Sequence, residues 1–181
     1  DYHYLKRPYQ LQPNVADGMP QVSYRDAQGN EPPADAPVES IAETVYEIRI
    51  RPGIRYQPHP AFALDAEGRP VYADLDEASL GERSQIGDFE HTGTRELVAA
   101  DFAYQIKRLV RPRIESPGLA IFNQIVGLED LAARLQAEVD AGRLDPGGWI
   151  DMRQFPLEGV ETPDPHTLRI RIRGGRFPRH A

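Results

Sequence analysis

The stretch TVYEIRIRPG, residues 44–53, decides the fold class. Apolar and charged side chains alternate along it and fall on opposite faces of an extended chain: Tyr46, Ile48 and Ile50 on one face, and Glu47, Arg49 and Arg51 on the other. Strict alternation is typical of a half-buried β-strand, because successive side chains of a strand point to opposite faces of the sheet. The Pro-Gly pair at residues 52 and 53 predicts the turn that ends this strand.

A second stretch, HTLRIRIRGG at residues 166–175, repeats the pattern, with Leu168, Ile170 and Ile172 alternating with arginines. If the two strands are neighbours, five arginines line one face of the sheet: Arg49, Arg51, Arg169, Arg171 and Arg173. Like charges directly opposite each other destabilise a sheet, so we expect interposed carboxylates or strands that are not adjacent. Such a face is either a platform for anions or nucleic acid, or a solvated face balanced by Glu47 and acidic loops. We favour the solvated face, because no aromatic side chain is interleaved among the charges.

Two helices are predicted between these strands. In TRELVAADFAYQIKRLVRPR, residues 94–113, apolar side chains recur at helical spacing as far as Val110, and Pro112 stops the helix. In LEDLAARLQAEVDAG, residues 128–142, Gly142 is the expected C-cap of a helix with an apolar stripe, formed by Leu128, Leu131, Leu135 and Val139. A short strand and its turn are expected in PQVSYRDAQGN, residues 20–30. This order of elements lacks a βαβ rhythm and predicts an α+β fold, with a small, mainly antiparallel or mixed sheet, two main helices and long loops.

Residues 54–93 lack sustained periodicity, and we interpret them as a long loop insertion over the surface. Within them, DAEGRPVYADLD, residues 65–76, is typical of a hairpin turn followed by a short strand. Loops of this length are uncommon unless they have a function or a large body to lie on.

Composition excludes several classes of function. The formal net charge of −7 argues against nucleic acid as the main partner, because nucleic-acid binding depends on neutralising phosphates with Lys and Arg. The absence of cysteine excludes disulfides, thiolate metal sites and thiol nucleophiles. No run of roughly eighteen apolar residues occurs, so we expect no membrane span. The chain begins with Asp and has no charged-then-apolar leader, so we expect either a removed signal sequence or a piece of a longer protein.

The candidate chemistry is sparse. The five histidines form no local metal motif, and the chain has neither a phosphate-binding glycine loop nor a Gly-x-Ser-x-Gly nucleophile elbow. Glu96 and Asp101 are candidates for a carboxylate pair, but Asp101 lies in the first helical turn, where negative charge complements the helix dipole. We therefore expect no enzyme activity, no cofactor and no metal. The same dipole accounts for a cluster of cations at the other end of this helix: Lys107, Arg108, Arg111 and Arg113.

Four strings in a fixed order resemble the extracellular solute-binding proteins of family 5, the oligopeptide- and dipeptide-binding receptors of ABC importers: YEIRIRPGIRY, TRELVAADFAYQIKRLVRPRIESPG, IVGLEDL and DPHTLRIRI. The positions that fill the family's motifs are Asp101, Phe102, Tyr104, Arg108, Ser116, Pro117, Asp164, Thr167 and Leu168. The resemblance spans Tyr46 to Ile172. It implies that residues 1–181 are a fragment of a two-lobed protein with a type II periplasmic-binding-protein-like fold, and cover its first-lobe subdomain.

The resemblance also implies a function, as the substrate-binding component of an ABC-type import system. Such a protein is periplasmic, comes from a secreted or lipid-anchored precursor, and delivers peptides or similar small solutes to permease subunits. The ligand-binding residues that it implies are Tyr2, Tyr4, Gly118, Phe122 and Asn123. Because family members are longer, we expect this chain to hold only part of the cleft, and we expect Arg108 to pair with a loop carboxylate. The alternative from another class is a free-standing interaction module that uses the arginine-rich sheet face to bind an acidic partner.

Val98 departs from the resemblance, because the family usually has threonine at this position. A threonine hydroxyl there caps the helix N-terminus, and the loss of such a cap costs about 1 kcal/mol. We therefore expect Thr94 or an upstream residue to take over the cap, or the end of the helix to fray.

Overall fold

The computed structural model of the chain describes residues 5, 7, 8, 10–81 and 83–175, which form two compact units. The first unit comprises the described residues of Asp1–Arg51 and Val98–Ala181 and contains the sheet and the longer helices. The second unit comprises Pro52–Leu97. Tyr2 and Tyr4, which the resemblance implies as ligand-binding residues, lie outside the described residues.

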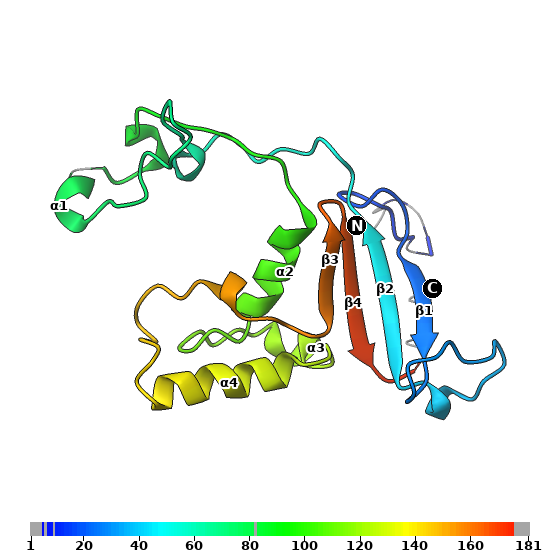
Figure 1. Cartoon of the computed structure of the whole chain (residues 1–181). Coiled ribbons are helices and arrows are strands. Elements are labelled where there is room, and N and C mark those ends of the chain that lie inside the picture. The colour runs from blue at the N-terminus through cyan, green and yellow to red at the C-terminus, as the bar shows by residue number, and fades with distance from the viewer. Residues whose placement is uncertain (1–4, 6, 9, 82, 176–181) are drawn as a thin grey trace. The chain divides into compact units, whose positions relative to one another are not determined.

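The sheet has four strands in the order β1-β2-β4-β3, and each neighbouring pair is antiparallel (Figure 1). The strands are β1 (Gln21–Arg25), β2 (Glu43–Arg49), β3 (Val160–Asp164) and β4 (Thr167–Arg173). The three stretches predicted as strands around residues 20–30, 44–53 and 166–175 are therefore confirmed, and so is the α+β class with an antiparallel sheet. The turn predicted after β1 is also present, since the Asp26 amide donates to the Asn30 carbonyl at 2.9 Å.

The sequence does not predict β3, whose residues VETPD include a proline and do not alternate between apolar and polar. Proline has no backbone N–H, so within sheets it is confined to edge strands and bulges. β3 meets both conditions, because it lies at the edge of the sheet and its register with β4 shifts between Glu161 and Asp164. A tight turn at residues 165–166 joins the two strands, so the hairpin recruits this segment into the sheet.

The helices of the first unit are α2 (Ala99–Arg108), α3 (Leu119–Phe122) and α4 (Leu128–Asp140). The apolar stripe predicted for α4 lies at the centre of the core, where Leu128, Leu131 and Leu135 are fully buried. Gly142 follows α4 with φ 68°, the left-handed conformation expected just beyond a helix C-terminus. α2 contacts β3 and β4, and Figure 1 shows it beside this hairpin. Both predicted helices are confirmed.

The start of α2 is stabilised by Asp101, which the sequence places in the first helical turn, and by a contact from the β3–β4 turn that the sequence does not indicate. Val98 is the N-cap residue, and its amide donates to the Asp101 carboxylate at 3.0 Å. The next amide, of Ala99, donates to the Pro165 carbonyl at 2.7 Å in the β3–β4 turn. Thr94 takes no part in this cap, because its hydroxyl donates to the Tyr56 carbonyl at 2.5 Å, so the expectation that it replaces the missing threonine was wrong.

The second unit, Pro52–Leu97, has more structure than the long loop that we expected. Its described residues form one short helix, α1 (Glu77–Leu80), and two 3₁₀ turns, η2 (Pro60–Phe62) and η3 (Ile86–Asp88). Its two ends run antiparallel through single bridges between Arg55 and Glu96 and between His59 and Gly93. A Cβ atom added at Gly93 would lie 1.9 Å from the Phe62 carbonyl oxygen, so only glycine fits at this close approach.

The hairpin turn predicted at residues 65–76 is only partly present. The Asp65 amide donates to the Arg69 carbonyl at 2.9 Å, which closes the turn, and one bridge joins Leu64 to Pro70. The residues that follow Pro70 form turns, so the short strand predicted there was wrong. A strand needs a neighbour along its length, and this segment has one only at the single bridge.

Replacing Val98 by threonine is expected to raise the free energy of unfolding by about 1 kcal/mol, because a hydroxyl at the N-cap can accept from an amide of the first helical turn. Val98 already has the extended backbone of an N-cap residue, with φ −127° and ψ 163°. For a chain of this size, the gain corresponds to roughly 2–4 °C in the midpoint of thermal unfolding. Val22→Thr, on the partly exposed β1, adds the same group away from any helix. An equal gain in both variants, or none in Val98→Thr, would contradict this cap.

Candidate functional site

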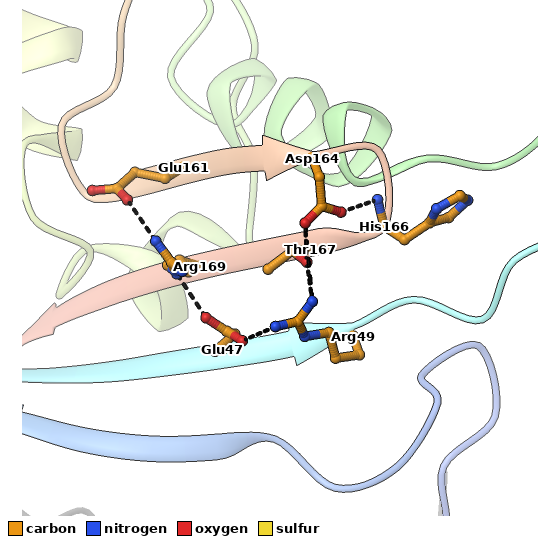
Figure 2. Close-up of polar contacts among 7 residues, drawn as sticks. All are labelled: Glu47, Arg49, Glu161, Asp164, His166, Thr167 and Arg169. Atoms are coloured by element: carbon orange, nitrogen blue, oxygen red, sulfur yellow. Dashed lines mark hydrogen bonds and ion pairs between the residues drawn. The ribbon is translucent and has the colours of Figure 1, made fainter.

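The charged face of the sheet is built around Glu47 of β2. Its carboxylate lies 2.7 Å from the guanidinium of Arg49 on the same strand and 2.7 Å from that of Arg169 on β4. Figure 2 shows the three side chains in a row across the two strands. More distant carboxylates flank the row, with Asp164 3.9 Å from Arg49 and Glu161 3.8 Å from Arg169. The interposed carboxylates that we expected are therefore present.

Thr167, the first residue of β4, connects this row to the β3–β4 turn. Its side chain is buried, with 1% of the residue exposed. The hydroxyl donates to the Asp164 carboxylate at 2.7 Å and accepts from the Arg49 guanidinium at 2.9 Å. Asp164 also accepts from the His166 amide at 2.8 Å, as Figure 2 shows. Thr167 and Asp164 thus fix the turn and the end of β2 together, which gives this motif position of the resemblance a structural role.

The remaining arginines of β4 are paired as well. Arg171 lies 3.1 Å from the Glu43 carboxylate and 2.9 Å from that of Glu158, and only 14% of its side chain is exposed. Arg173 lies 2.7 Å from Glu129 on α4. Every arginine of β2 and β4 therefore has a carboxylate partner, which favours the solvated, charge-balanced interpretation of this face over an anion platform.

The surroundings of the Glu47 and Asp164 carboxylates favour their ionised form. The hydrogen bond from Arg169 is the main cause that lowers the pKa of Glu47, and Arg49 lowers it further. The pKa of Asp164 is lowered first by the Thr167 hydroxyl and then by the His166 amide. Both groups suit an ion pair at neutral pH, and neither suits a proton donor.

The opposite, apolar face of the sheet carries an open groove of about 290 Å³. Its floor is formed by side chains of β2 and β4: Tyr46, Ile48, Ile170 and Ile172. Its wall is formed by α3 and the residues after it: Ile121, Phe122, Gln124 and Ile125. Two of the wall residues are open to solvent, with Ile121 77% and Phe122 38% exposed. Burial raises the pKa of the Tyr46 phenol, and the neighbouring Tyr24 raises it further, so Tyr46 stays neutral.

The wall of this groove is held against the sheet by main-chain hydrogen bonds. The Val126 amide donates to the Arg171 carbonyl at 3.0 Å, and the Arg173 amide donates to the Gln124 carbonyl at 2.9 Å. Residues 124–126 thus pair with β4 at the end that β3 does not cover. The amide of Gly159, the residue before β3, donates to the Val126 carbonyl at 2.9 Å. This pairing fixes α3 beside the apolar face.

The described residues that the resemblance implies as ligand-binding, Gly118, Phe122 and Asn123, lie in different environments. Phe122 lines the groove. Asn123 is the C-cap residue of α3, and its carbonyl accepts from the Arg173 guanidinium at 3.0 Å. Gly118 is the N-cap residue of α3 and lies outside the groove lining. Sequence reasoning missed the floor of the groove, although the apolar half of the strand alternation already marked Tyr46 and Ile170 as facing one side.

The other motif positions of the resemblance pack against the core or form hydrogen bonds with nearby residues. Phe102 and Tyr104 pack against the core from α2. Ser116 and Pro117 lead into α3, where the Ser116 carbonyl accepts from the Leu119 amide at 3.1 Å. Arg108 donates to the Gln105 side chain at 3.3 Å, and the described residues include no carboxylate paired with it, contrary to our expectation.

The described residues include no group of three or more His, Cys, Asp or Glu side chains placed to hold a metal ion. None of the helices found in the described part of the chain has the length and apolar character needed to cross a bilayer.

No protein-family model and no curated protein matches this chain. The resemblance to the family 5 solute-binding proteins therefore rests on the quoted strings and their order.

The lowered pKa values predict how stability depends on acidity. Because Glu47 and Asp164 bind protons more weakly in the folded chain than in the unfolded one, their stabilisation is present at neutral pH. It is lost as the pH falls from about 5 through the folded pKa values. Urea unfolding at a series of pH values is expected to show this loss, and Glu47→Gln is expected to make the dependence shallower.

Glu161→Gln is the matched control for this experiment, because its carboxylate stands on the same face but 3.8 Å from Arg169. It is expected to change the slope less than Glu47→Gln does. If the two variants flatten the pH dependence of stability equally, the close ion pairs of Glu47 contribute no more to it than the distant carboxylate of Glu161 does, and the prediction is wrong.

Proposed function

We propose that this chain is part of the substrate-binding component of an ABC-type import system that takes peptides or similar solutes. On this proposal the fold is part of a type II periplasmic-binding-protein-like architecture, the protein acts in the periplasm, and permease subunits are its partners. The support from sequence is the order of the four strings between Tyr46 and Ile172. The observation that carries the proposal is Phe122: the resemblance implies it as a ligand contact, and it lines an open apolar groove.

The chemistry of the groove suits part of a peptide. An extended peptide is held mainly by its main chain, while shallow apolar pockets accept its alternate side chains. A floor of isoleucines and one neutral tyrosine offers no charge and favours an apolar side chain. The half-exposed Phe122 and the exposed Ile121 provide surface that loses contact with water when such a side chain enters.

The size of the groove limits what it can hold. Sites for whole small ligands usually enclose about 300–1,000 Å³ and bury most of the ligand. At about 290 Å³ and open on one side, this groove matches one large side chain rather than a peptide of several residues. This agrees with the proposal that the chain contributes only part of a cleft.

The chain by itself is expected to bind peptides weakly. Isothermal titration calorimetry with mixed di- to pentapeptides should show no tight binding, because one side-chain pocket offsets little of the entropy lost on association. Micromolar affinity from residues 1–181 alone would contradict the claim of a partial cleft.

The protein expressed from the reading frame extended past Ala181 provides the positive test. If the extension encodes a second lobe, we expect peptide binding that falls roughly tenfold, or about 1.4 kcal/mol, in Phe122→Ala for peptides with a large apolar side chain. Peptides of glycine and alanine should lose less. Leu11→Ala, an exposed apolar residue outside the groove, is the control. An extended protein that binds no peptide would overturn the proposed function.

The alternative, an interaction module for an acidic partner, receives little support from the paired arginines of β2 and β4. Their carboxylate partners would have to be displaced before a polyanion could bind. We expect weak binding to a polyanion such as heparin, with little change when Arg49 or Arg171 is replaced by glutamate. Titration at several salt concentrations measures this; tight, salt-sensitive binding that either charge reversal removes would favour the interaction module instead.

A further inference from the structure

A second pocket lies at the C-terminal end of α2 and shares no lining residue with the groove. It encloses about 380 Å³ between α2 and the loop at residues 145–152. Its lining combines two guanidinium groups, of Arg108 and Arg111, with two aromatic rings, of Tyr104 and Trp149. Ile150 and Met152, both buried, form its apolar floor.

The cations around this pocket differ from those of the sheet. Within the described part of the chain, none of the four basic residues at 107–113 forms an ion pair with a carboxylate: Lys107, Arg108, Arg111 and Arg113. Arg108 donates to the Gln105 side chain and Arg111 to the Gly148 carbonyl at 2.5 Å, so neither guanidinium is hydrogen-bonded to a terminal carbonyl of α2. Their positive charge complements the dipole at the end of α2, as the sequence predicts, but no carboxylate of the described residues is paired with it.

The carboxylates of the neighbouring loop are already engaged. Asp151 lies 2.7 Å from the Arg153 guanidinium, and Asp145 accepts from the Gly147 amide at 2.8 Å. Burial lowers the pKa of the Lys107 ammonium, an effect that the charge of Asp151 opposes. The pocket thus keeps an excess of positive charge next to apolar and aromatic surface.

Trp149, the single tryptophan of the chain, is 81% exposed. Large aromatic side chains are usually well buried, and an exposed one next to a cavity is typical of a binding surface. Its main chain is nevertheless anchored on both sides, by the bond from Arg111 to the Gly148 carbonyl and by the buried Ile150. Gly148 permits this arrangement, because an added Cβ would lie 2.9 Å from the Asp145 carboxylate. The main chain on both sides of Trp149 is therefore fixed, and the exposed indole lines the pocket without being covered.

We propose that this pocket binds a small organic anion with a flat, unsaturated ring, through a carboxylate or phosphate group. Guanidinium groups recognise both anions through paired, charge-assisted hydrogen bonds. The exposed indole and the Tyr104 ring provide flat faces for an aromatic ring. The volume falls within the usual range for small-molecule sites. The proposal does not depend on peptide import, since it uses neither the groove nor a second lobe.

Trp149 reports directly on this binding, because no other tryptophan contributes to the fluorescence. The chain is titrated with phenyl phosphate and phenylacetate, which carry both ring and anion, and with inorganic phosphate, acetate and benzyl alcohol, which lack one of the two. We expect a saturable fluorescence change with the ring anions and affinities at least tenfold weaker for the other probes. The comparison of phenyl phosphate with phenylacetate decides which anion is preferred.

Arg108→Gln and Arg111→Gln are each expected to weaken binding of the ring anions at least tenfold, and Trp149→Phe, followed by calorimetry, to weaken it less. Arg51→Gln, which removes an exposed guanidinium elsewhere, should bind as the unchanged chain does. Thermal unfolding checks that each variant is folded, and the probe comparison on the unchanged chain needs no variant. The proposal is overturned if no ring anion gives a saturable change, if inorganic phosphate binds as tightly as phenyl phosphate, or if both arginine variants retain full affinity.

Discussion

The ion pair between Glu47 of β2 and Arg169 of β4 joins the two strands in their observed register, and both faces of the sheet depend on that register. In the observed pairing Glu47 stands opposite Arg169 and Glu43 opposite Arg173. A slip of one residue would turn the isoleucines to the charged face, because side chains alternate with a period of two. A slip of two in one direction would set Arg49 opposite Arg169. Burial therefore disfavours a slip of one residue, and charge disfavours this slip of two.

The same register positions the elements around the sheet. It places Thr167 where its hydroxyl joins Asp164 to Arg49, and so ties the β3–β4 turn to the end of β2. That turn supplies the Pro165 carbonyl to the first amide of α2. At the other end of β4, the main chain of residues 124–126 continues the ladder and carries α3 to the apolar face. The groove and the start of α2 are thus consequences of one strand pairing.

The sequence predicts those elements whose pattern is local. β2 and β4 can be predicted because apolar and charged residues alternate along them. α4 can be predicted because apolar residues recur at helical spacing over more than two turns of the helix. β3 and α3 are not evident, since one contains Pro163 and the other has four residues, and each is held by a partner far along the chain. The cap of α2 could not be predicted in full for the same reason, because its second component, the Pro165 carbonyl, lies in another element. Phe122 could be assigned to a site only through the resemblance, and its groove partners only once the strands were paired.

The distribution of charge explains why two clusters of arginine in one acidic chain differ. The chain has more acidic than basic residues, 28 against 21, so carboxylates are not scarce. In β2 and β4 each arginine has a glutamate partner, from the sheet or from a neighbouring segment, and Arg171 has two. Residues 107–113 contain four cations and no acid, and the loop that faces them commits Asp145 and Asp151 to its own turns. An arginine is available to a ligand where the fold brings no carboxylate to it, and at the end of α2 the fold brings an indole instead.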